Sequence, residues 1–85
     1  MPVSPVFLKR TRGYGYIVES YRGEDGKPRQ RYLPGGYIGK HASVEQARDY
    51  HCAEAWRWID QDYFKYEKHS IKAARLSLYM REISS

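Results

Sequence analysis

The dipeptide Asp25-Gly26 stands between two runs of residues that favour β-strands. Residues 15–22 are rich in Tyr, Ile and Val, and residues 29–33 form a second run after Pro28. An Asp-Gly pair at such a place is a strong signal for a two-residue hairpin turn, because glycine tolerates the positive φ that these turns require. The sequence therefore predicts an antiparallel hairpin whose turn fixes which side chains share a face of the sheet.

A third strand-like run, residues 7–12, precedes this hairpin, and a helix is expected after it. Ser43 and Gln46 form a capping box, in which each side chain satisfies an amide of the first helical turn. No proline or glycine occurs from Val44 to Lys68. Apolar side chains recur there at steps of three and four and predict a buried stripe on one helix of about 44–68, namely Cys52, Trp56, Ile59, Tyr63 and Tyr66.

These elements predict an α+β fold in which a three-stranded antiparallel sheet packs on a long helix towards the C-terminus (βββα). Residues 1–6 are expected to form an extended lead-in because Pro2 and Pro5 disfavour helix, and residues 7–68 form the domain. Ser70 could begin a second helix. We expect residues 69–85 to form that terminal helix, packed on the domain or used for association.

Charge is distributed unevenly along the 85 residues. Residues 1–40 contain eight Lys and Arg against three acids, hence +5, whereas residues 41–85 contain seven of each, hence zero. A basic half favours a polyanionic partner, most often nucleic acid. The single cysteine, Cys52, fits a reducing compartment, and no signal or membrane segment is visible. We expect a protein without membrane contact, cytoplasmic or nucleoid-associated, whose oligomeric state stays open.

The turn at Asp25-Gly26 predicts which face of the sheet is open. It pairs Arg22 with Arg29, so that alternation puts the tyrosines and arginines on one face and Ile17, Tyr21 and Tyr32 on the other. Three arginines can hardly be buried without partners, so their face is expected to be the open one. That face contains Tyr14, Tyr16, Val18, Ser20, Arg22, Arg29 and Arg31.

Two motifs resemble a known DNA-binding family. The segment Tyr37-Ile38-Gly39, two spacer residues and then 42–50 resembles the third strand and helix start of the plant ethylene-response-factor domain. Arg10-x-Arg12-x-Tyr14-Gly15 looks like that family's first strand. The related arm-binding domains of phage and transposon integrases share the three strands and helix. Tyr14 stands in place of the family's tryptophan, and Pro34-Gly35-Gly36 has no counterpart there.

The resemblance covers about residues 7–55 and implies a sheet laid in the major groove of double-stranded DNA. Its contacts would come from Arg10, Arg12, Tyr14, Tyr16 and Arg22, with Arg29 or Arg31 added by the third strand. The insertion of Pro34-Gly35-Gly36 leaves open whether Arg31 or Tyr37 takes the third-strand contact position. A second likeness links 16–22 and 26–31 to the amino-terminal hairpin of insertion-sequence transposases. Both likenesses imply a phage or mobile-element origin.

Other chemistry has little support in the sequence. His51 and Cys52 are adjacent and diverge by about 100° on a helix, and no CxxC or His-x3-His spacing exists, so no metal site is expected. Cys52 is expected to be a small buried thiol in the helix stripe. We expect no enzyme and no cofactor, because no nucleophile, base or phosphate loop stands in a suitable context.

The sequence leaves three functions in order of preference. The first is a small basic DNA-binding module that uses the open face of its sheet. The second is a protein-binding module, such as a phage-encoded inhibitor or adaptor, because Trp56 and Trp58 diverge by about 200° on a helix and one should be exposed. The third is RNA binding, in which exposed rings stack on bases.

Overall fold

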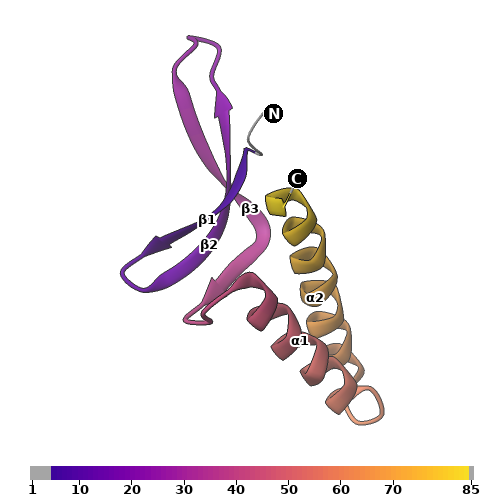
Figure 1. Ribbon diagram of the computed structural model, residues 1–85. Helices are drawn as coiled ribbons and strands as arrows, with labels where there is room; N and C mark the ends of the chain where they lie inside the picture. The colour runs from indigo at the N-terminus through magenta and orange to yellow at the C-terminus, as the bar shows by residue number, and fades with distance from the viewer. Residues whose placement is uncertain (1–4, 85) are drawn as a thin grey trace.

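The computed structural model describes residues 5–84 and contains a sheet followed by two helices (Figure 1). Strands β1 (Val6–Thr11), β2 (Tyr14–Arg22) and β3 (Pro28–Gly39) form one antiparallel sheet in the order β1-β2-β3. Helices α1 (Val44–Trp58) and α2 (Tyr63–Ser84) follow. The predicted α+β class and three-stranded sheet are confirmed. Most of the predicted lead-in lies outside the described residues, and Val6 already belongs to β1.

The turn between β2 and β3 differs from the predicted two-residue turn. Gly23 donates its amide to the Lys27 carbonyl at 3.0 Å, and Gly26 donates to the Gly23 carbonyl at 2.9 Å, so three residues form the loop. Gly26 has φ of 78°, whereas Asp25 keeps an ordinary φ and accepts a 3.0 Å hydrogen bond from the Lys27 amide. A two-residue turn of type I′ would need positive φ at both positions.

This longer loop shifts the predicted register by one residue. Arg22 pairs with Pro28 and Tyr21 pairs with Arg29, so Arg22 and Arg29 are not opposite one another. Since alternation has a period of two, the shift moves the side chains of one strand to the other face. The prediction that Arg22, Arg29 and Arg31 share a face was therefore wrong.

A large bulge interrupts β3 where Pro34, Gly35 and Gly36 occur. Val18 pairs with Tyr32 and Tyr16 pairs with Tyr37, so residues 33–36 lie opposite Ile17 alone. Tyr32 and Tyr37 are five residues apart and would face opposite sides in a regular strand, but the bulge returns both to one face. Gly36 is required there, because a Cβ at this position would lie 2.8 Å from the Cβ of Ile17.

The helices form a hairpin, and the single long helix predicted for 44–68 was wrong. The cap at Ser43 is confirmed, because the Gln46 amide donates to Ser43 Oγ at 3.0 Å. The Gln46 side chain accepts a 2.7 Å hydrogen bond from the amide of Ala42, which precedes the cap, rather than from an amide of the first turn. However, α1 ends at Trp58, and Asp62 caps α2 by accepting a 3.2 Å hydrogen bond from the Lys65 amide. The predicted break at 68–70 lies inside α2.

The core lies between the sheet and α2. Its buried members come from both layers and from the start of α1, namely Val6, Ile17, Ile38, Val44, Ala47 and Leu76. Helix α2 contacts β1 and β3, and α1 packs mainly on α2. The predicted stripe on α1 does not cover the sheet, because Trp56 is 70% exposed and Cys52 is also exposed rather than a buried thiol.

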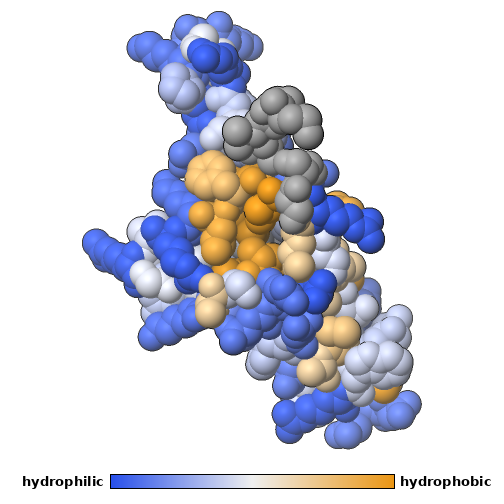
Figure 2. Space-filling view, viewed as in Figure 1, coloured by the Kyte–Doolittle hydropathy of each residue, from blue (hydrophilic) through white to orange (hydrophobic). Residues whose placement is uncertain are grey.

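The molecule is elongated, with extents of 50 × 24 × 24 Å. The far end of the β2–β3 hairpin projects beyond the helices (Figure 1). Figure 2 shows apolar surface gathered where the sheet meets the helices, whereas the projecting hairpin is hydrophilic. Within residues 5–84, neither helix is long and apolar enough to span a bilayer.

Candidate nucleic-acid interface

The face of the sheet that points away from the helices is rich in tyrosine. Ile17 points into the core, so its neighbours Tyr16 and Val18 and their paired residues point the other way. We call this the open face. Its polar and aromatic members are Phe7, Lys9, Thr11, Tyr14, Tyr16, Ser20, Arg22, Gln30, Tyr32 and Tyr37.

Four tyrosines run across this face as a continuous series of ring contacts, here called the tyrosine row. Tyr14 lies 6.4 Å from Tyr37, Tyr37 lies 5.1 Å from Tyr16, and Tyr16 lies 5.2 Å from Tyr32, between ring centroids. Tyr32 is 60% exposed. Such rings offer flat apolar surfaces whose hydroxyls can still bond to a partner.

Cations lie at both ends of the tyrosine row. The Lys9 ammonium lies 5.9 Å from the Tyr32 centroid, and the Lys40 ammonium lies 5.6 Å from the Tyr14 centroid. Arg22 lies further along β2 and donates a 2.8 Å hydrogen bond to the Gly26 carbonyl. The strand residues that the observed pairing puts on this face include no aspartate or glutamate. The open face is therefore cationic without an internal counter-charge.

Two of the predicted contact residues lie on the opposite side of the hairpin. Arg31 pairs with Glu19, donating from both Nε and Nη2, and its guanidinium lies 5.2 Å from the Tyr21 centroid. Arg29 forms an ion pair with Asp25 at 3.2 Å. Because each has an acidic partner and faces away from the tyrosine row, Arg29 and Arg31 do not form one contact surface with Tyr14, Tyr16 and Arg22.

The other two predicted arginines also lie away from the open face. Arg10 pairs with Gly15 and donates hydrogen bonds of 2.9 and 2.7 Å to the carbonyls of His41 and Ala42, which ties β1 to the segment before α1. Arg12 lies at the tip of the β1–β2 turn with φ of 53° and is exposed. Of the seven predicted residues, the structure brings together Tyr14, Tyr16 and Arg22.

Sequence reasoning missed Lys9, Lys40 and Tyr32 as members of this site and considered Tyr37 only as an alternative to Arg31. Tyr32 was expected to face the helix because the register was one residue out, but its ring contacts Tyr16. Of the other two residues expected there, Ile17 is buried in the core and Tyr21 is 40% exposed on the projecting hairpin. The adjacent Pro34-Gly35-Gly36 was the available signal, since such residues favour a bulge that changes the alternation.

Comparisons with known proteins give no assignment. No family model, no curated protein and no solved structure matches this chain. The likeness to ethylene-response-factor and integrase arm-binding domains therefore depends on the quoted motifs alone. Among residues 5–84, no group of three or more His, Cys, Asp or Glu side chains could hold a metal ion.

Proposed function

We propose that this chain is a small nucleic-acid-binding module that lays the open face of its sheet on duplex DNA. The observation that carries the proposal is the tyrosine row, flanked by Lys9 and Lys40 on a face without carboxylates. Uncompensated cations attract a polyanion, whereas the paired arginines Arg29 and Arg31 contribute less.

The residues on this face and at the neighbouring hairpin ends have distinct roles in the proposed complex. Lys9, Lys40, Arg22 and Arg12 contact phosphates, because they lie around the row and at the ends of the two hairpins. Tyrosine hydroxyls donate to phosphates, and the rings pack against sugars and thymine methyl groups. The projecting β2–β3 hairpin suits the major groove, which is about 12 Å wide and admits a two-stranded ribbon.

Salt dependence tests the proposal directly. If those four cations each neutralise a phosphate, affinity for random duplex DNA should fall about 10²-fold between about 50 and 200 mM salt. Fluorescence anisotropy with a labelled duplex gives this slope. Lys9→Gln should reduce the slope by about one, whereas the double variant Arg29→Gln with Arg31→Gln should change affinity less than Lys9→Gln with Arg22→Gln. A slope near zero would contradict the proposal.

The same assay separates duplex from single-stranded targets. Stacking on the tyrosine row would favour unpaired bases, with about 1–3 kcal/mol per stacked base. Competition of an unlabelled RNA or DNA strand against the labelled duplex measures this preference. If the single strand displaces the duplex at lower concentration, and Tyr32→Leu removes that advantage, the partner is single-stranded nucleic acid instead.

The exposure of Trp56 favours a second candidate function, a protein-binding surface on the helical hairpin. Trp56 is 70% exposed, while Trp58 donates its indole N–H to Glu54 and lies beneath Lys65. A large exposed ring on a helix is typical of binding hot spots. Under this alternative, Trp56→Ala leaves DNA affinity unchanged but abolishes association with a partner protein.

A further inference from the structure

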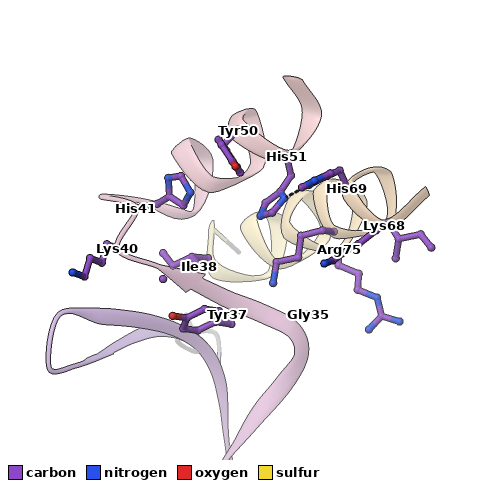
Figure 3. A pocket seen from close by; sticks show the side chains of 13 residues that line it. Gly35, Tyr37, Ile38, Lys40, His41, Tyr50, His51, Lys68, His69 and Arg75 are labelled. Carbon is purple, nitrogen blue, oxygen red and sulfur yellow. Dashed lines mark hydrogen bonds between the residues drawn. The ribbon is translucent and has the colours of Figure 1, made fainter. Parts of the chain in front are cut away.

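A cavity of about 550 Å³ lies between the second half of β3 and the two helices (Figure 3). Its basic lining comes from His51 on α1, from Lys68, His69, Lys72 and Arg75 on α2, and from Lys40 and His41 between β3 and α1. This volume lies in the range of about 300–1,000 Å³ that is usual for small-molecule sites.

The charges that line this cavity are all positive. No aspartate or glutamate lines it, and no ion pair joins Lys68, Lys72 or Arg75 to a carboxylate elsewhere in the part of the chain that the structure describes. The nearby Glu54 is already engaged by Trp58 and Arg57. The three cations follow the spacing i, i+4, i+7, which places them along one face of α2.

Two histidines meet inside the cavity and bond to each other. The Nδ1 atoms of His51 and His69 lie 2.9 Å apart, so one ring donates and the other accepts a single N–H (Figure 3). Burial, reinforced by His69, Lys72 and His41, lowers the pKa of His51 to about 4, although Glu54 raises it. Burial and the neighbouring Arg75 likewise lower the pKa of Lys72.

A cation is a poor ligand for this cavity. A metal ion held by His51 and His69 would lie among the charges of Lys72, Lys68 and Arg75 and would lack a third protein ligand among residues 5–84. An anion, in contrast, would provide the missing counter-charge and accept hydrogen bonds from several donors at once. The electrostatics of the cavity therefore select an anionic ligand.

The cavity walls suit a flat organic group next to that anion. Tyr50 contributes an aromatic ring, and Ile38 and Ile71 contribute aliphatic surface. We infer that this cavity binds a phosphate monoester carried by a flat organic group, with Lys72 and Arg75 as the main phosphate contacts. Such a group belongs either to a free nucleoside monophosphate or to the 5′-terminal phosphate of a nucleic acid strand.

Calorimetric titration with adenosine monophosphate, inorganic phosphate and adenosine tests the site. We expect the monophosphate to bind more tightly than either of its parts. Lys72→Gln and Arg75→Gln should each weaken it about tenfold or more, as expected for loss of a charge-assisted hydrogen bond. Lys27→Gln removes the same charge from the exposed loop of the β2–β3 hairpin and should leave the affinity unchanged.

Nuclear magnetic resonance provides the structural readout. Saturating monophosphate should shift the imidazole signals of His51 and His69 in the unchanged protein, and Lys72→Gln should reduce that shift at the same ligand concentration. Absence of saturable binding at millimolar concentrations would overturn the inference. Binding that Lys72→Gln and Arg75→Gln leave intact would overturn it as well.

Two oligonucleotides of one sequence, with and without a 5′-phosphate, distinguish the sources of the ligand. A preference for the phosphorylated strand that Lys72→Gln removes would identify a strand terminus. Binding of the free monophosphate without this preference would identify a small molecule. The double variant Lys9→Gln with Tyr32→Leu should weaken binding of duplex DNA to the open face but leave monophosphate binding intact. Failure of the proposed DNA binding can therefore be distinguished from failure of the proposed monophosphate site.

Discussion

Lys9 and Arg10 are neighbours in β1, yet they point to opposite faces and serve different purposes. Lys9 lies at the end of the tyrosine row, whereas Arg10 bonds to two backbone carbonyls before α1. A guanidinium that satisfies carbonyl groups at 2.9 and 2.7 Å stabilises the fold and has fewer donors left for a ligand. The contacts of a basic strand residue, rather than its charge alone, therefore show whether it stabilises the fold or is available to a ligand.

Arg10→Ala should lower the free energy of unfolding by about 1–3 kcal/mol, because it removes two charged hydrogen bonds between β1 and the segment before α1. Arg12→Ala is the matched control, since Arg12 lies at an exposed turn, and it should change stability by less than about 0.5 kcal/mol. Urea denaturation of both variants measures the difference. Equal stabilities would mean that the Arg10 contacts contribute nothing.

The lowered pKa of His51 predicts a pH effect on stability. Its folded pKa of about 4 is below the ordinary 6.5, so the unfolded chain binds more protons between these values. Stability should therefore fall as the pH is lowered from about 6.5 towards 4, by about 1 kcal/mol for this half-exposed ring once screening by water is considered. The groups around it are His69, Lys72, His41 and Glu54.

Denaturation of the unchanged protein and of His51→Gln across this pH range isolates the effect. The unchanged protein should lose more stability than the variant as the pH falls, because glutamine cannot take up the proton. Parallel curves for the two proteins would show that His51 titrates normally in the folded state.

At the scale of elements, features that depend on a few neighbouring residues were predicted more accurately than features that depend on the pairing of two segments. The cap at Ser43 and the strand at residues 15–22 were found because their causes lie within a few residues. The register was missed because Asp-Gly also fits a three-residue loop with positive φ at Gly26 alone. The turn after Trp58 was missed because no glycine or proline marks it.

The candidate site was harder to predict than the fold class. Tyr14, Tyr16 and Arg22 were correctly grouped because they lie on one strand, where alternation needs no partner. Arg29, Arg31 and Tyr32 depended on the register across the turn, and Tyr37 depended on the bulge. A single-residue error in one loop was enough to exchange Arg29 and Arg31 for Tyr32 on the open face, and the bulge adds Tyr37.

The bulge in β3 should be intolerant of side chains at Gly36. Gly36→Ala places a Cβ 2.8 Å from the Cβ of buried Ile17 and should cost about 1–3 kcal/mol of stability through overpacking. At Gly23 the nearest atoms belong to the long, exposed side chain of Arg29 rather than to a buried residue, so Gly23→Ala should cost much less. Thermal unfolding of both variants provides the comparison, and a neutral Gly36→Ala would contradict this account.

At the scale of the whole molecule, the two candidate sites meet at the end of β3, where Tyr37 and Lys40 belong to the open-face site and also lie among the residues that line the cavity. The open face depends on the sheet alone, whereas the cavity needs β3 and both helices in place. A ligand in the cavity therefore stabilises the packing of helices on the sheet. Duplex DNA on the open face does not bridge these layers.

Adenosine monophosphate should consequently raise the melting temperature, because a ligand that binds only the folded state stabilises it by mass action. At a concentration about 100 times its dissociation constant, the expected gain is about 2.7 kcal/mol. The same concentration should give a smaller rise for Lys72→Gln and the full rise for Lys27→Gln. Equal rises in all three proteins would place the ligand elsewhere.

The bulge also determines how mutations along β3 will be tolerated. Before Leu33 the outward positions are even-numbered, and after Gly36 they are odd-numbered, since Tyr32 and Tyr37 lie on one face. A saturation scan of residues 28–39 should therefore show a two-residue rhythm of tolerated and forbidden substitutions that slips by half a period at 33–36. Deleting one residue within 33–36 would leave Tyr32 and Tyr37 four residues apart, so both would stay on one face and the two-residue rhythm would run through β3 without a slip.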